Sequence, residues 1–213
     1  RSRRQRQMCI RDRAHRGFFP VEDLKTLRHT GSYLQGHPDM KHIPGVDMSS
    51  GSLGQGISAA VGMAISAKLS NDDYRVYTLL GDGEIQEGQV WEASMLAGFR
   101  KLDNLVVIVD NNNLQIDGRI DEVNSPYPID KKFEAFNFHV INIDGHDFDQ
   151  IAAAFKEARE TKGMPTAIIA KTIKGKGVSF MEDQAGWHGK APNDEEYLSL
   201  IHISEPTRRR GIS

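Results

Sequence analysis

The chain has 213 residues, a formal net charge of −2 at pH 7 and a single cysteine. This length suffices for one domain with a proper core. One cysteine excludes a disulfide within the chain, so a reducing compartment is permitted. No apolar run approaches the length of a membrane span and no signal peptide is visible, so we expect no membrane partner.

The two ends of the chain do not resemble parts of a domain. Met8 to Asp12 can be encoded by ATG TGT ATA AGA GAC, and the reverse complement of this DNA, shifted by one base, encodes Ser199 to His202. A sequencing adapter translated on opposite strands would give both ends, so we expect residues 1–13 and 198–213 to be artefactual tails. The alternative is a basic arm for nucleic acid.

Removing these tails changes the charge balance. The first thirteen residues carry +5 and the last sixteen carry +2, so the formal −2 becomes −9 for residues 14–197. An acidic domain of this kind argues against a nucleic-acid partner. We therefore expect one domain over residues 14–197.

A short helix and a long loop begin this domain. Residues 18–27 predict a helix with Pro20 in its first turn. The glycine-rich loop over residues 31–56 is too long to be a mere connection, and such loops are usually functional. Ile57 to Leu69 follows and is apolar nearly all round, which predicts a buried helix against the sheet or a partner subunit.

The chain is organised around a strand–helix–strand unit from Tyr74 to Gly118. Val76 to Leu80 and Leu105 to Val109 predict two buried parallel strands. The expected crossover helix carries Trp91, Met95, Leu96 and Phe99 on one side. Because parallel strands end at the same edge of a sheet, Asp82 and Asn112, which follow the two strands, should face one crevice.

The Gly81-Asp82-Gly83 turn predicts a metal-bridged diphosphate. The glycines allow a tight turn close to a ligand, and the following helix offers N–H groups to an anion. Gln86 stands where a dinucleotide fingerprint has its third glycine, which excludes that motif. Asp82 would repel a bare diphosphate. A hard cation held by Asp82, the Asn112 amide oxygen and a backbone carbonyl removes this conflict, and magnesium suits such ligands.

The remaining elements complete an α/β domain. We expect strands at His139 to Ile143 and Thr166 to Thr172, with a helix from about Gln150 to Arg159 between them. This order predicts a doubly wound, mainly parallel sheet with helices on both faces. His146 either faces the crevice or is structural. Lys174 and Lys176 either attract phosphate or form a solvated surface, and His42 is expected on the surface.

Two stretches, GDGEIQEGQVWEA and VDNNNLQIDG, resemble the thiamine diphosphate motif in its transketolase form. The resemblance covers about residues 17–197 and implies thiamine diphosphate and Mg²⁺ as cofactors. It assigns Asp82, the Asn112 side chain and the backbone oxygen of Leu114 to magnesium. It also assigns Gly81 and Gly83 to the cofactor diphosphate.

The flanking loops extend this resemblance. His37 lies in a GHP sequence that faces the substrate in transketolases, and Gly51 to Gly54, with Leu53 at the aminopyrimidine, matches the loop against the cofactor. His188, in AGWHGKAP, matches a histidine that reaches both the cofactor diphosphate and the substrate. Glu87 matches an acid at the subunit contact. The resemblance implies that His37, His188 and Glu87 take part in catalysis.

The implied reaction is transfer of a two-carbon ketol unit from a ketose phosphate to an aldose phosphate. The family's pyrimidine-binding domain, whose glutamate activates the cofactor across a dimer interface, is absent. The chain alone should therefore be inactive, and the implied partner is a pyrimidine-binding C-terminal domain or subunit in a homodimer or heterotetramer. APNDEEYL favours the N-terminal subunit of a split transketolase, and the expected location is the cytoplasm.

Two other functions stay open at this point. A 1-deoxy-D-xylulose 5-phosphate synthase shares the GDG element but normally lacks the QEG continuation found at Gln86-Glu87-Gly88. A non-catalytic cofactor-binding module would keep the fold and lose a metal ligand, whereas Asp82 and Asn112 are both present here.

Overall fold

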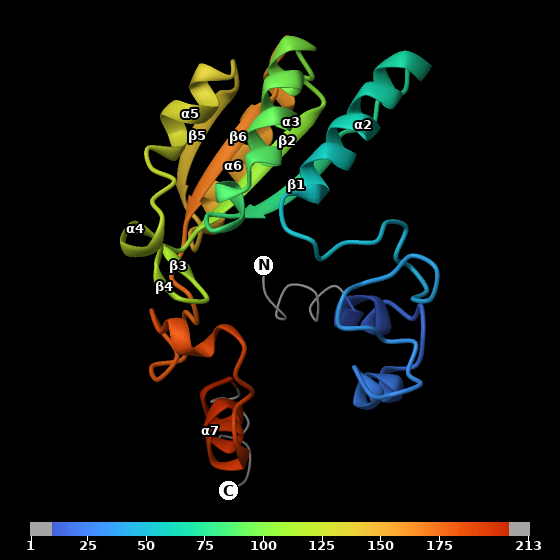
Figure 1. The fold of residues 1–213 in the computed structure, drawn as a ribbon, viewed down its shortest axis with the longest axis vertical. Helices are drawn as coiled ribbons and strands as arrows, with labels where there is room; N and C mark the ends of the chain where they lie inside the picture. Colours follow the sequence, from blue (N-terminus) through green and yellow to red (C-terminus); the bar gives the residue numbers. More distant parts are fainter. Residues whose placement is uncertain (1–9, 205–213) are drawn as a thin grey trace, which may run out of the picture.

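The computed structural model describes residues 10–204, and its centre is a four-stranded parallel sheet in the order β1-β2-β6-β5 (Figure 1). The strands are β1 (Val76–Gly81), β2 (Leu105–Asn111), β5 (His139–Asp144) and β6 (Thr166–Lys171). Gly81 pairs with Asp110, and Asp144 pairs with Lys171. All four carboxyl ends therefore lie at one edge of the sheet.

Helices cover both faces of this sheet. On one face, α2 (Gln55–Ser70), α3 (Gly88–Phe99) and α5 (Ile129–Ala135) form the main core with inward side chains of β1, β2 and β6. On the other face, α6 (Phe148–Glu160) packs Ala154 and Ala158 against Val106 and Ile168. The predicted doubly wound α/β architecture is confirmed.

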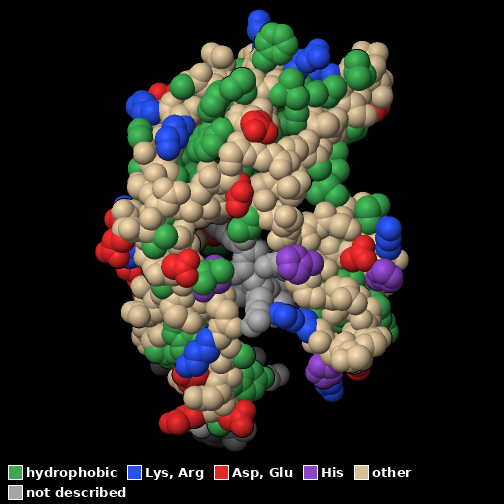
Figure 2. All heavy atoms as spheres, in the orientation of Figure 1, with side chains coloured by type: hydrophobic (Ala, Val, Ile, Leu, Met, Phe, Trp, Pro, Cys, Tyr) green, Lys and Arg blue, Asp and Glu red, His purple; other side chains and the backbone are tan. Residues whose placement is uncertain are grey.

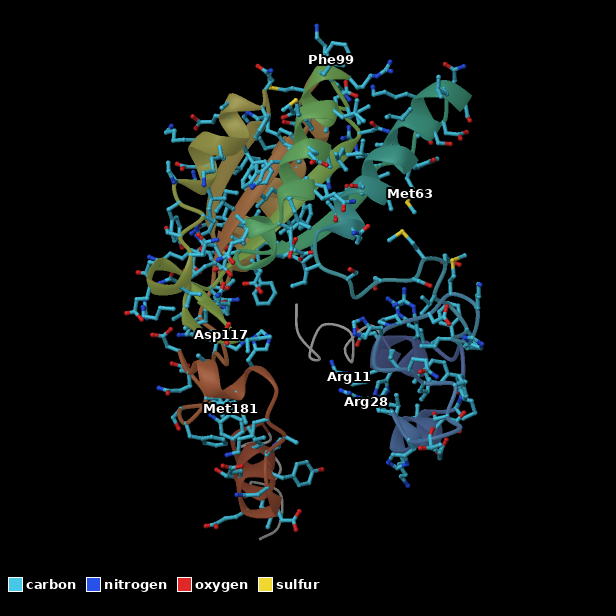
Figure 3. All side chains as sticks on the ribbon, viewed as in Figure 1. Arg11, Arg28, Met63, Phe99, Asp117 and Met181 are labelled. Carbon is cyan, nitrogen blue, oxygen red and sulfur yellow. The ribbon has the colours of Figure 1, made fainter. Side chains whose placement is uncertain are left out.

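The contact face of α3 differs from the prediction. Val90, Ala93 and Ala97 are buried, whereas Met95, Leu96 and Phe99 are 59, 42 and 76% exposed. Figure 3 shows Phe99 at the end of α3, pointing away from the sheet. Small side chains let α3 approach its neighbours closely, so the large apolar residues turn outward. They contribute to the hydrophobic side chains visible at the upper end of Figure 2.

Helix α2 shows the same arrangement. Ile57, Ala60, Val61 and Ala64 are buried against the sheet. Met63 and Leu69 are 43 and 79% exposed. The helix is therefore buried along one side only, and the expectation of burial nearly all round is wrong for the chain by itself.

Gly98 provides a test of this close packing. A Cβ at Gly98 would lie 1.9 Å from the backbone oxygen of Phe136, so Gly98→Ala should lower the free energy of unfolding by about 2–3 kcal/mol. The matched control is Gly62→Ala in α2, where no described atom lies within 4 Å of the new Cβ. It should stabilise by about 0.5–1 kcal/mol. Urea unfolding measures both, and equal effects would contradict the packing argument.

Two flanking segments lie beyond the carboxyl ends of the strands, on opposite sides (Figure 1). The first contains a 3₁₀ helix, η1 (Val21–Thr26), in place of the predicted helix over 18–27, with Pro20 at its N-cap position. The second contains η3 (Ala185–His188) and α7 (Asp194–Ser204). Trp187 anchors it, since the indole is buried and Nε1 donates to the Phe180 oxygen at 2.9 Å.

A small hairpin and a short helix lie between β2 and α5. The hairpin pairs β3 (Leu114–Gln115) with β4 (Gly118–Arg119), and α4 (Ile120–Val123) follows it. Figure 3 shows Asp117, in the hairpin turn, on the side of the molecule away from Phe99. The hairpin thus extends the carboxyl edge of the sheet.

The predicted tails lie partly outside the described residues. Residues 1–9 and 205–213 are outside, whereas residues 10–15 are helical, with Ile10 in a buried cluster with Phe19, Leu34 and Ile43. That residues 1–13 and 198–213 are artefactual stays a prediction. Within the described part of the chain, none of the helices has the length and apolar character of a membrane span.

Candidate active site

A cavity of about 660 Å³ lies at the carboxyl ends of the strands. This volume is in the range of small-ligand sites. The turn after β1, the end of β2, the β3–β4 hairpin and the loop after β6 form its walls. Most of the residues predicted for the site line it, namely Gly51, Leu53, Gly81, Asp82, Gly83, Glu87, Asn112, Leu114 and His188.

Asp82 links the ends of the two central strands. Its side chain is buried at 1% exposure, and its carboxylate accepts hydrogen bonds from the backbone N–H groups of Gly83 at 2.9 Å and Asn113 at 2.5 Å. Asn113 has a φ of 58°, a left-handed conformation that asparagine tolerates. This conformation belongs to the turn in which the Asn113 N–H group reaches Asp82.

Asn112 is held by its own loop. Its Oδ1 accepts from the Leu114 N–H at 3.0 Å, and its Nδ2 donates to Asp110 Oδ1 at 3.4 Å. Asp82, Asn112 and Leu114 thus bring a carboxylate, an amide oxygen and a backbone carbonyl to one cavity. These are hard oxygen donors of the kind that magnesium prefers, so the donor set fits the predicted metal.

The cavity is predominantly acidic. Five carboxylates line it, from Asp82, Glu84, Glu87, Asp110 and Asp117, together with one lysine, Lys174. Tyr127 nearby responds to this field: burial first, and then the charge of Asp82, raise the pKa of its hydroxyl. An anionic ligand in this cavity therefore needs a bound cation to offset the carboxylates.

Both glycines of the GDG turn already donate their N–H groups within the protein. The Gly81 N–H donates to Glu84 at 3.1 Å, and the Gly83 N–H donates to Asp82. A Cβ at Gly83 would lie 3.3 Å from Gln115 Cβ. The contribution of Gly83 is therefore the absence of a side chain in a tight turn.

His37 lies at Gly51 and is exposed to solvent. A Cβ at Gly51 would be 1.9 Å from His37 Nδ1, and Gly51 has a φ of +126° that L side chains rarely adopt. Gly51 lines the cavity, whereas His37 does not. His188 reaches the cavity from the opposite flanking segment, at the end of η3. The structure therefore brings the two predicted catalytic histidines to the same region from opposite ends of the chain.

Gly54 stands behind the cavity wall. It is the N-cap residue of α2, with a φ of 78°, and it is buried. A Cβ there would lie 2.9 Å from Glu87 Cβ. Close packing, rather than a direct place in the cavity, explains a glycine at this position.

Two features that the sequence left open now have positions. His146 lines the cavity, and its Nε2 accepts from the Ile173 N–H at 2.7 Å, so the ring supports the start of the loop after β6. Lys174 lines the same cavity, and Lys176 lines a neighbouring one. His42 is on the surface, where its Nδ1 lies 2.5 Å from Asp39.

Glu84 was not among the predicted site residues. It lines the cavity and accepts hydrogen bonds from Gly54 and Gly81. No sequence motif marks such a contact, because Gly54 and Glu84 are 30 residues apart.

Comparison with known proteins agrees with this geometry. The family model for the thiamine diphosphate binding domain of transketolase matches residues 15–203. The 6-deoxy-6-sulfo-D-fructose transketolase subunit SqwG of Clostridium sp. (strain MSTE9) is 45% identical over 188 residues, which are 88% of this chain and 68% of that protein. Transketolase of Mus musculus is 48% identical over 181 residues, 83% of this chain and 28% of that protein.

A solved structure shows the same relationship. The structure of transketolase from Campylobacter jejuni matches with a TM-score of 0.79 at 37% identity, covering 87% of this chain and 29% of that one. A family match over nearly all described residues, together with a close relative covered for two thirds of its length, shows the family. The chain therefore belongs to the transketolase family, of which it carries the thiamine diphosphate-binding domain.

Proposed function

We propose that this chain binds the diphosphate end of thiamine diphosphate through Mg²⁺ and serves a transketolase reaction. That reaction transfers a two-carbon ketol unit from a ketose phosphate to an aldose phosphate. The observation that carries the proposal is the pairing of Asp82 and Asn112 at adjacent strand ends in an acidic cavity. A diphosphate is repelled from such a cavity unless a cation lies between.

In this proposal, Asp82, the Asn112 side chain and the Leu114 backbone oxygen hold the magnesium ion. Gly81 and Gly83 keep the turn free of side chains beside the diphosphate, and Leu53 lies against the aminopyrimidine. The bound thiamine diphosphate supplies the electron sink for carbon–carbon bond cleavage. The role of the protein is to hold and orient the reacting groups and to exclude water.

His37, His188 and Glu87 are the proposed catalytic residues. The histidines bind substrate hydroxyl groups and move protons near neutral pH. Glu87 is exposed in this chain and precedes α3 as its N-cap residue. A partner domain placed over this position would bury the carboxyl group, and burial raises a carboxyl pKa.

We further propose that the chain is the N-terminal subunit of a split transketolase. It spans 68% of the SqwG subunit but 28% of the mouse transketolase, so its matched region makes up most of a subunit and a minor part of a single-chain enzyme. The partner is a pyrimidine-binding C-terminal subunit or domain, in a homodimer or heterotetramer. The expected compartment is the cytoplasm.

Co-expression tests this function. The chain alone should show no ketol transfer between sugar phosphates, and adding a pyrimidine-binding transketolase subunit should produce it, because the cofactor-activating glutamate comes from that subunit. The assay measures aldose phosphate consumption with and without Mg²⁺ and thiamine diphosphate. A chain without the partner is the control.

Two results would replace the proposal. Magnesium-dependent cofactor binding without any ketol transfer, in the presence of a folded partner, would identify a non-catalytic cofactor-binding module. Condensation of pyruvate with glyceraldehyde 3-phosphate in place of ketol transfer would identify a 1-deoxy-D-xylulose 5-phosphate synthase-like enzyme.

A further inference from the structure

Glu84 connects two glycine loops that are distant in the sequence. Its Oε2 accepts a hydrogen bond from the Gly81 N–H and its Oε1 accepts one from the Gly54 N–H, each at 3.1 Å. Gly81 ends β1, and Gly54 is the N-cap residue of α2. One carboxylate therefore bridges the GDG turn and the Gly51–Gly54 loop.

We propose that Glu84 is a positioning residue that sets the separation of these two loops and so preorganises the cofactor cavity. The inference rests on the proposed cofactor site, in which the diphosphate lies against the GDG turn and the aminopyrimidine against Leu53. A ligand that spans both loops binds tightly only when their separation matches its length. Bridging them before the ligand arrives reduces the ordering cost of binding.

The surroundings of Gly54 support this role. Helix α2 has no acidic residue in its first turn and no side-chain hydrogen bond at its cap. The Glu84 carboxylate thus supplies both the acceptor and the negative charge that the amino end of a helix favours. On its other side, Gly54 packs so closely against Glu87 that a Cβ would lie 2.9 Å from Glu87 Cβ. Gly54 is therefore held between Glu84 and Glu87.

Charge and positioning predict opposite effects of neutralising Glu84. The carboxylate lines an already acidic cavity. If Glu84 acted only through its charge, removing that charge would strengthen the binding of an anionic ligand. If Glu84 bridges the loops, Glu84→Gln weakens binding, because the glutamine amide presents an NH₂ group to one of the two N–H donors and keeps only one acceptor.

The test compares Glu84→Gln with Glu92→Gln in the full chain. Glu92 lies on the exposed side of α3, so its substitution makes the same chemical change away from the loops. Calorimetry measures the affinity for thiamine diphosphate and for inorganic pyrophosphate, both with Mg²⁺. We expect Glu84→Gln to weaken thiamine diphosphate binding about tenfold, pyrophosphate binding less than threefold, and Glu92→Gln to change neither. Pyrophosphate contacts only the GDG side, so it is insensitive to loop separation.

Hydrogen exchange provides a second measurement that needs no cofactor. In the ligand-free chain, the Gly54 and Gly81 amides should exchange about tenfold faster in Glu84→Gln than in the parent or in Glu92→Gln. Unchanged exchange at both amides, or tighter thiamine diphosphate binding by Glu84→Gln, would overturn the positioning role. Equal weakening of both ligands would also overturn it, since that indicates a local defect of the GDG turn. Failure of the parent chain to bind thiamine diphosphate would count against the cofactor site itself, and the exchange data would still decide the role of Glu84.

Discussion

Replacing Asp82 by asparagine is expected to weaken magnesium-dependent binding of thiamine diphosphate by at least about a hundredfold, or about 2.7 kcal/mol. Asp82 supplies the carboxylate of the proposed metal site and accepts hydrogen bonds from two backbone N–H groups. Asparagine keeps the shape of the side chain but loses the charge and one acceptor oxygen. Calorimetry with and without Mg²⁺ measures the effect.

The control for this variant is Asp72→Asn, because Asp72 lies in an exposed turn before β1. The control should bind the cofactor like the parent. Circular dichroism establishes that Asp82→Asn is folded, and the magnesium dependence separates a lost metal ligand from a general loss of structure. Cofactor binding that stays equally strong and equally dependent on magnesium in Asp82→Asn would remove Asp82 from the metal site.

Replacing Gly51 by alanine should lower kcat/KM for ketol transfer by at least about a hundredfold in the complex with the pyrimidine-binding subunit. The new Cβ would lie 1.9 Å from His37 Nδ1, so His37 has to leave its position. The backbone adds strain, because a φ of +126° suits glycine and disfavours L side chains. Steady-state kinetics with a ketose phosphate donor and an aldose phosphate acceptor measure the loss.

A double-mutant cycle separates the contact with His37 from the strain. If Gly51 acts through His37, the loss of activity in the double variant Gly51→Ala/His37→Asn should be no greater than in the larger of the two single variants. Gly56→Ala is the matched control, since no described atom lies within 4 Å of a Cβ at Gly56. Additive losses from the two substitutions would show that Gly51 and His37 act independently.

The sequence predicted the strands and the two strand-end motifs well, for a physical reason. Strands buried on both faces appear as continuous apolar runs, and each run here stops at glycine or asparagine. The rule that parallel strands end at a common edge then placed Asp82 and Asn112 together, and both line the cavity. The order β1-β2-β6-β5 did not follow from the sequence, because strand order depends on pairing between distant segments.

The misses share a cause. The face of α3 was assigned from the largest apolar side chains, but close approach selects Ala93, Ala97 and Gly98 for the contact. The contacts from Glu84 to Gly54 and from His37 to Gly51 are tertiary, and no local pattern encodes them. Family resemblance supplied His37 and His188, whereas Glu84 emerged only from the three-dimensional structure.

The central position of β6 affects how the protein is made. Its residues, Thr166–Lys171, are synthesised after all the other strands of the described sheet, yet β6 is inserted between β2 and β5. Until the ribosome has released this segment, β2 and β5 have no common neighbour, and their facing edges stay unpaired. Unpaired strand edges make a nascent chain prone to aggregation, and such long-range pairing folds slowly. Chains halted before residue 166 should therefore depend on chaperones for solubility.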